Sequence, residues 1–121
     1  MKGYTQIYTG NGKGKTTAAL GLSLRAVGAG KKVFFAQFVK GEAYSEVKTI
    51  QKFLSDITIK QYGLKCFIYE KPSQADIDAA REGLKEVSEI IVSDKYDVIV
   101  LDEANIAIYY NLFTDDELIN I

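Results

Sequence analysis

The 121-residue sequence contains no histidine and one cysteine, Cys66. A Cys/His zinc site and a disulfide within the chain are therefore excluded, and we expect Cys66 to be a small core or half-buried residue. No apolar run approaches the ~20 residues of a membrane-spanning helix. Residues 1–3 lead directly into a β-prone segment rather than a signal peptide, so we expect a cytoplasmic protein with no membrane partner.

Composition and charge favour a single folded domain that binds an anion. Hydrophobic residues make up 47% of the sequence, enough for one packed domain over residues 1–121. Residues 1–60 hold ten Lys and Arg against three Asp and Glu, whereas residues 61–121 hold five against thirteen. A basic N-terminal half suits a nucleoside triphosphate, although a solvated surface explains most individual lysines equally well. Nucleic acid is not expected, because no basic stretch is interleaved with aromatic residues.

The most informative stretch is glycine-rich and covers residues 9–17 (TGNGKGKTT). It follows a short β-prone run at residues 4–8 and precedes a helical pattern at residues 16–27. The order strand, loop and helix is typical of a phosphate-binding loop, in which backbone N–H groups and a helix N-terminus hold the phosphates. Lys15 would add a full positive charge, and Thr16 a hydroxyl for Mg²⁺.

The stretch departs from the common pattern G-x-x-x-x-G-K-[ST] at one position. The pattern places a glycine five residues before Gly14, where this sequence has Thr9. A glycine-rich surface turn is the alternative explanation. We favour the phosphate loop, because strand, loop and helix occur together in the required order.

The remaining elements are predicted from apolar periodicity and from turn and capping residues. The first helix is apolar around most of its circumference, as expected for packing against a sheet. Further elements are strands at residues 32–39, 57–62 and 96–102, helices at residues 44–54 and 74–93, and a capping box at residues 114–117 that opens a last helix. Residues 63–72 fit either a short strand or an aromatic loop. Alternating strands and helices predict a three-layer α/β domain, with a mostly parallel sheet and helices on both faces.

A second chemical motif lies at residues 96–103 (YDVIVLDE). Four consecutive apolar residues predict a buried strand, which delivers Asp102 and Glu103 to the carboxyl edge of the sheet. After a phosphate loop this is the Walker B position, where Asp102 would orient Mg²⁺ and Glu103 would position a water or contact a second ligand. The motif is not specific alone, and it gains specificity from the loop that precedes it.

Six segments together resemble the P-loop type of ATP:cob(I)alamin (corrinoid) adenosyltransferase. They are residues 8–21 (YTGNGKGKTTAALG), 25–30 (RAVGAG), 38–41 (FVKG), 71–73 (KPS), 79–81 (AAR) and 100–105 (VLDEAN). The resemblance covers nearly the whole chain, and the threonine at the first loop position is the family's own pattern. It implies a P-loop NTPase-like (RecA-like) fold. Family members continue for several tens of residues further, so this chain is expected to be short at its C-terminus.

The resemblance implies transfer of the 5′-deoxyadenosyl group of ATP to the Co(I) of a corrinoid, cob(I)alamin or cobinamide, with release of tripolyphosphate, in cobalamin biosynthesis or salvage. It also implies Mg²⁺ or Mn²⁺ as cofactor and an electron donor that reduces cobalt. A second copy of the chain, in a homodimer, is a further candidate partner. Because Co(I) is itself a strong nucleophile, no general base is required and no catalytic residue is predicted with certainty.

The site residues follow by position in the family's motifs. The ATP-binding residues would be Gly10, Asn11, Gly12, Lys13, Gly14, Lys15, Thr16 and Thr17. Thr16 and Asp102 would lie near the metal. Glu103 and Asn105 would lie near the metal, the nucleoside or the corrinoid. Phe67 and Tyr69 are candidates for packing against the corrinoid, and ordinary core packing is the competing explanation for both.

Two other functions fit the same motifs. The chain would be a P-loop ATP hydrolase or kinase if Glu103 activated water or an acceptor for attack on the γ-phosphate. It would be a non-catalytic nucleotide-binding fragment if it bound ATP but no corrinoid. Product analysis separates these functions, because only the adenosyltransferase releases tripolyphosphate in a corrinoid-dependent way.

Overall fold

Strands and helices alternate along the chain in the computed structural model, which describes residues 3–9, 14–39, 41, 45–64 and 71–120. The elements are α1 (Lys15–Gly28), β1 (Val33–Phe38), α2 (Ser45–Phe53), β2 (Ile57–Tyr62), α3 (Gln74–Ser93), β3 (Val98–Asp102), α4 (Ala104–Tyr109) and α5 (Asp115–Ile119). None of the helices in these ranges is both long and apolar enough to span a bilayer.

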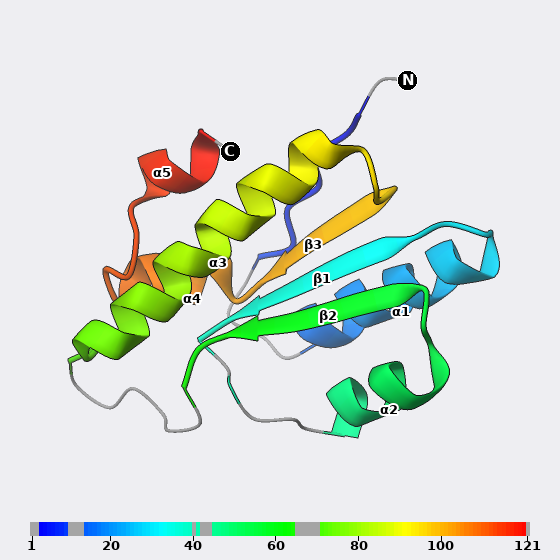
Figure 1. The fold of residues 1–121 in the computed structure, drawn as a ribbon, viewed down its shortest axis with the longest axis horizontal. Coiled ribbons are helices and arrows are strands. Elements are labelled where there is room, and N and C mark those ends of the chain that lie inside the picture. Colours follow the sequence, from blue (N-terminus) through cyan, green and yellow to red (C-terminus); the bar gives the residue numbers. More distant parts are fainter. Residues whose placement is uncertain (1–2, 10–13, 40, 42–44, 65–70, 121) are drawn as a thin grey trace.

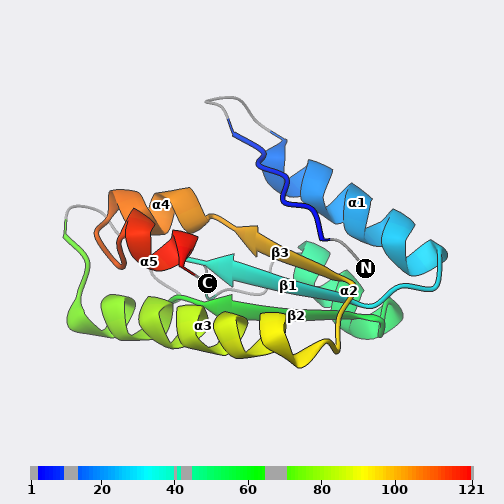
Figure 2. The same ribbon diagram turned by 90° about the horizontal axis from the view of Figure 1, so that it is seen from above.

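The three strands form a parallel sheet in the order β2, β1, β3 (Figure 1). All six residues of the central strand, β1, are buried, as expected for a parallel strand covered on both faces. Because the strands are parallel, their carboxyl ends lie at the same edge, and Figure 2 shows the three arrowheads pointing to one side. The register pairs Gln37 of β1 with Gln61 of β2 and with Asp102 of β3 at that edge.

Helices cover both faces of the sheet and confirm the predicted three layers (Figure 1). On one face, Val33 and Phe35 of β1 pack with residues of α1 and α2. On the other face, Phe34 and Phe38 pack with residues of α3 and α4 and with Phe113. The alternation of side chains along β1 therefore divides the core into two clusters, one on each side of the sheet.

The predicted start of α3 is confirmed in detail. The Ser73 hydroxyl accepts a hydrogen bond from the backbone N–H of Asp76 at 3.2 Å, and the Asp76 carboxylate accepts one from the backbone N–H of Ser73 at 2.8 Å. This reciprocal capping box satisfies two of the N–H groups that a helix start leaves unpaired. Ile91 was predicted on the apolar face of the helix but is 40% exposed, whereas its neighbour Ile90 packs against the core in the last turn of α3.

The prediction of a strand at residues 4–8 is wrong. Within the described residues this segment forms no strand and pairs with no neighbour, and Tyr4 and Ile7 are 85% and 78% exposed. Figure 2 draws it as a coil outside the three strands. β-prone residues favour an extended chain, but a strand also needs backbone hydrogen bonds to a partner strand, and this segment pairs with neither of the two edge strands, β2 and β3.

The first helix was predicted to be apolar around most of its circumference, and only one side of it meets the sheet. Ala19 and Ser23 are buried there, whereas Leu22 and Leu24 on the other sides are 39% and 54% exposed. Apolar composition thus predicted the helix correctly, but it overstated how much of the helix is covered in this chain.

Candidate functional site

The site begins at the N-terminus of α1. Gly14 is the N-cap and has φ 105°, a left-handed conformation that favours glycine. No acidic residue lies in the first turn and no side chain caps this end within the described residues. The positive end of the helix dipole therefore meets no carboxylate from the first turn of α1, which suits the binding of an anion. Lys15 and Thr17 are exposed at this end, and the predicted loop residues Gly10, Asn11, Gly12 and Lys13 lie outside the described residues.

Two predicted metal-site residues, 86 positions apart in the sequence, meet directly. The Thr16 hydroxyl lies 2.9 Å from Oδ1 and 3.2 Å from Oδ2 of Asp102, to which it donates a hydrogen bond. Asp102 is 7% exposed at the carboxyl end of β3, and Thr16 is half-buried in the first turn of α1. The loop helix and the acidic strand therefore converge, as the sequence motifs require.

Two glutamines that the sequence reasoning missed extend this contact across the sheet. The Gln37 side-chain amide donates from Nε2 to Oδ2 of Asp102 at 3.2 Å. Its carbonyl oxygen, Oε1, accepts a hydrogen bond from Nε2 of Gln61 at 3.0 Å. Gln37 is fully buried and Gln61 half-buried. A polar residue inside the apolar run of residues 33–39 was the available signal, because a buried amide needs partners.

The backbone turns sharply where β1 and β3 end. Val39 has φ 70° and Glu103 has φ 64°, conformations that are unusual for residues other than glycine. Gly41 lies so close to the loop after β2 that a Cβ atom there would be 2.4 Å from the carbonyl oxygen of Gly63. Strained and tightly packed backbone therefore gathers at the carboxyl edge of the sheet, where ligands bind in α/β folds.

The remaining predicted residues are only partly placed. Glu103 is half-buried and forms the N-cap of α4, and Asn105 is exposed in the first turn of that helix. Both therefore lie at the same edge as Asp102, and their roles stay predictions. Phe67 and Tyr69, the candidates for corrinoid contact, lie outside the described residues, and so does Cys66.

The donor atoms at the edge suit a hard divalent cation. Thr16 offers a hydroxyl oxygen and Asp102 a carboxylate, and Mg²⁺ prefers such oxygen ligands. In the ranges that the structure describes, no group of three or more His, Cys, Asp or Glu side chains gathers to hold an ion. The pair of a Thr16 hydroxyl and an Asp102 carboxylate fits Mg²⁺, which is commonly held by one or two protein oxygens together with substrate phosphates and water.

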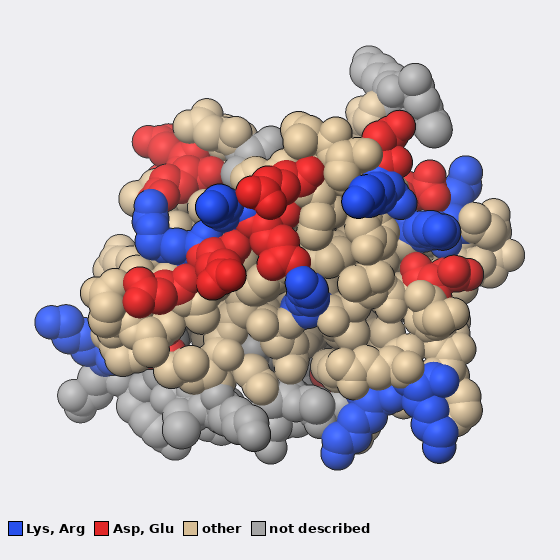
Figure 3. Space-filling model, viewed as in Figure 1, with Lys and Arg blue, Asp and Glu red and all other residues tan. Residues whose placement is uncertain are grey.

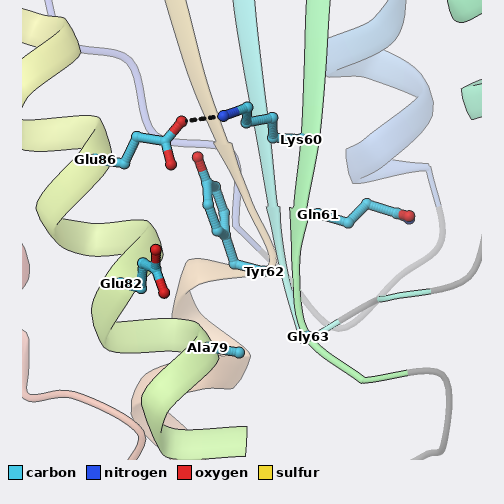
Figure 4. A pocket seen from close by; sticks show the side chains of 7 residues that line it. All are labelled: Lys60, Gln61, Tyr62, Gly63, Ala79, Glu82 and Glu86. Carbon is cyan, nitrogen blue, oxygen red and sulfur yellow. Dashed lines mark hydrogen bonds and ion pairs between the residues drawn. The ribbon is translucent and has the colours of Figure 1, made fainter.

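A separate hollow of about 330 Å³ lies between β2 and α3 and is lined by Lys60, Tyr62, Glu82 and Glu86, among others. Lys60 forms an ion pair with Glu86. Figure 4 shows these side chains on one face of β2, whereas Gln61 points away from them. The hollow is therefore on the other side of the sheet from the Gln61 amide, and we do not include it in the candidate site.

The Tyr62 hydroxyl is buried in this hollow close to the Glu86 carboxylate, without a hydrogen bond of regular geometry among the described atoms. Burial raises the pKa of Tyr62, and the carboxylates of Glu86 and Glu82 raise it further. The phenol is therefore neutral at physiological pH.

The surface around α3 and α5 carries much of the acidic C-terminal half. Figure 3 shows acidic side chains gathered over these two helices, with Lys and Arg side chains among them. Arg81 of α3 reaches Glu117 of α5 through two hydrogen bonds of 3.1 and 2.6 Å. This contact lowers the pKa of Glu117 and attaches α5 to α3.

Comparison with known proteins decides the family. The model of the family described as ATP:corrinoid adenosyltransferase BtuR/CobO/CobP matches residues 1–121. The chain belongs to this family. Its curated relatives include corrinoid adenosyltransferases of Escherichia coli K12 and Pseudomonas aeruginosa, each 32% identical over 98% of this chain. The corrinoid adenosyltransferase CobA of Salmonella typhimurium shows the same identity over the same share.

The chain spans 60% of the length of the Escherichia coli and Salmonella relatives and 59% of that of the Pseudomonas relative. The matched part contains both motifs of the family that form the candidate site, the phosphate loop and the acidic strand end. The activity of these longer relatives is therefore a proposal for this chain.

Proposed function

We propose that the protein transfers the 5′-deoxyadenosyl group of ATP to the Co(I) of a corrinoid, cob(I)alamin or cobinamide, and releases tripolyphosphate. The observation that carries the proposal is the hydrogen bond between Thr16 and Asp102. It joins the start of α1 to the end of β3, which is where a nucleotide and its cation are bound in P-loop proteins. Membership of the family supplies the reaction class.

The chain's own residues would act mainly on the leaving group. Attack at C5′ of the ribose expels all three phosphates together, so their negative charge must be held along the whole triphosphate. The N–H groups at the start of α1, Lys15 and the loop at residues 10–13 would bind it, in the manner of helix N-termini that bind phosphate. Thr17, the next residue of the helix, would also contact the triphosphate.

The cation is proposed to be Mg²⁺ or Mn²⁺, held by Thr16 and Asp102. When bound, it would neutralise part of the charge that develops on the departing triphosphate. Asp102 would orient the cation or its water shell, and Glu103 and Asn105 would lie beside the nucleoside or the corrinoid. Phe67 and Tyr69 remain proposed corrinoid contacts.

The corrinoid would bind without a histidine ligand to cobalt, because the sequence has no histidine. Apolar contacts and hydrogen bonds would have to hold it. The proposal also includes a separate electron donor that supplies Co(I), a cytoplasmic location and assembly as a homodimer. Residues 1–121 would serve as one P-loop nucleotide-binding domain.

The test is an anaerobic reaction of the chain with ATP, Mg²⁺ and chemically reduced cob(I)alamin, with separation of the phosphate products. We expect tripolyphosphate in amounts equal to the adenosylated corrinoid, and none without corrinoid. Orthophosphate or ADP as the product would support a hydrolase or kinase instead. ATP binding without corrinoid binding or turnover would indicate a chain that only binds nucleotide.

A further inference from the structure

The amides of Gln61 and Gln37 and the carboxylate of Asp102 form a row across the carboxyl edge of all three strands. The register places Gln37 opposite both of the other residues. The hydrogen bonds run in one direction, from Gln61 to Gln37 at 3.0 Å and from Gln37 to Asp102 at 3.2 Å. The row ends at the Thr16 hydroxyl on the far side of Asp102.

The direction of this row is fixed by chemistry. An ionised carboxylate only accepts hydrogen bonds, so the group of Gln37 that faces Asp102 must be its NH₂. The carbonyl oxygen of Gln37 then faces β2 and needs a donor, because a buried acceptor without a partner costs free energy. Gln61 supplies that donor. Each amide therefore sets the orientation of the next, and the row has one self-consistent arrangement.

Gln37 also holds Asp102 without neutralising it. A lysine or arginine in this place would pair with the carboxylate and compete with a cation for it, whereas an amide adds no charge. The Gln37 amide donates to Oδ2 of Asp102, whereas the Thr16 hydroxyl lies nearer to Oδ1, at 2.9 Å, than to Oδ2, at 3.2 Å. The carboxylate is thus held from the sheet side by an uncharged group.

We infer that Gln37 is a positioning residue for the cation that accompanies the nucleotide, and that Gln61 acts on that cation only through Gln37. The inference rests on the proposed function, because the cation is that of bound ATP. Groups that orient a metal ligand in this way typically change metal affinity about 10–100-fold when they are removed. The row also joins the cation site to the end of β2, directly before the segment at residues 63–72.

The test measures ATP binding by calorimetry over a series of Mg²⁺ concentrations, and once with a chelator. Gln37→Leu keeps the size of the side chain but removes both hydrogen bonds. We expect it to raise the Mg²⁺ concentration needed for tight ATP binding about tenfold or more, with ATP affinity in chelator unchanged. Gln61→Leu should shift the same quantity in the same direction by less. Gln51→Leu, in the exposed part of α2, is the matched control and should change nothing.

The double variant Gln37→Leu/Gln61→Leu decides how Gln61 acts. If Gln61 acts only through Gln37, the double variant should match Gln37→Leu alone. Additive effects, or an unchanged Mg²⁺ requirement in Gln37→Leu, would overturn the inference. If Gln37→Leu does not fold, Gln61→Leu alone carries the test, and an unchanged Mg²⁺ requirement in that variant overturns the inference too.

The inference and the proposed function fail in different ways. Wild-type chain that binds ATP independently of Mg²⁺, yet adenosylates corrinoid, would overturn the inference and leave the function intact. Wild-type chain that shows Mg²⁺-dependent ATP binding but no adenosylation would overturn the function, and the glutamine variants would still test the inference.

Discussion

Gly83 offers the sharpest test of the packing between α3 and β2. It lies in the interior of α3, and a Cβ atom added there would be 2.4 Å from Cγ of Tyr62 and 2.8 Å from its Cβ and Cδ1 atoms. Ordinary carbon contacts are about 3.5–4.0 Å. Gly83→Ala therefore requires the new methyl group on α3 and the Tyr62 side chain on β2 to lie about 1 Å further apart. The contacted atoms include the Cβ of Tyr62, so a rotation of the Tyr62 side chain cannot provide this separation, and the helix or the strand must shift.

The expected loss follows from two opposing contributions. Overpacking of this kind costs about 1–3 kcal/mol, whereas alanine in place of glycine favours a helix by about 1 kcal/mol. The close approach, to Cγ and Cβ of Tyr62, places the overpacking cost in the upper part of its range, about 2–3 kcal/mol, so we expect a net loss of about 1–2 kcal/mol in the free energy of unfolding. For a chain of this size that corresponds to a fall in Tm of roughly 3–10 °C.

The matched control is Gly21→Ala in α1, where an added Cβ would meet nothing within 4 Å in the described residues. The same substitution should there raise stability by about 0.5–1 kcal/mol, because only the helix preference changes. Thermal and urea unfolding followed by circular dichroism would measure both variants. If Gly83→Ala were as stable as the wild type while Gly21→Ala gained stability, the packing of α3 on Tyr62 would be refuted.

Three further outcomes follow. Lys15→Ala should weaken ATP binding roughly 10–150-fold, since a charge-assisted contact contributes about 1.5–3 kcal/mol, and unchanged affinity in calorimetry would contradict its phosphate role. The Arg81 guanidinium, followed by the Thr114 backbone N–H, lowers the pKa of Glu117. The stability that these two contacts give the folded chain is therefore present above the ordinary carboxyl pKa of 4.5. It is lost as the pH falls through the lowered pKa of Glu117. Arg81→Gln should slightly reduce Tm at neutral pH and not in acid, and equal effects in both would argue against the ion pair. Tyr62→Phe removes a buried hydroxyl that has no regular hydrogen bond among the described atoms, so the free energy of unfolding should be unchanged or raised. A loss in urea unfolding would show instead that the hydroxyl is bonded to Glu86.

Much of the fold could be predicted because its signals are local. The capping residues Ser73 and Asp76 and the spacing of Ala80, Leu84 and Val87 defined α3 closely, since all of these features act within one helix. The strand at residues 4–8 was predicted wrongly, because strand formation depends on a partner that no local pattern shows. The helix α4 was not predicted, since a helix of six residues is stabilised mainly by tertiary packing, here of Ala104 and Ala107.

Some residues of the candidate site could likewise be predicted from local motifs, and others could not. Thr16 and Asp102 were found because each belongs to a motif with a known spacing, and their contact across the fold could be expected from the order of the motifs. Gln37 and Gln61 belong to no motif, and their meeting depends on the register between β1 and β2. A lone glutamine in a buried strand marks a polar partner somewhere in the core, but only the assembled sheet identifies which one.

Under the proposed function, the ribose C5′ of ATP, rather than a phosphorus atom, is attacked at this site. ATP labelled with ¹³C at C5′ tests it most directly, in an anaerobic reaction of the chain with Mg²⁺ and reduced cob(I)alamin followed by NMR. The labelled carbon should become bonded to cobalt, and tripolyphosphate should be released with it. Label that remains in ATP, ADP or AMP while phosphate is released would show attack at phosphorus and rule out the adenosyl transfer.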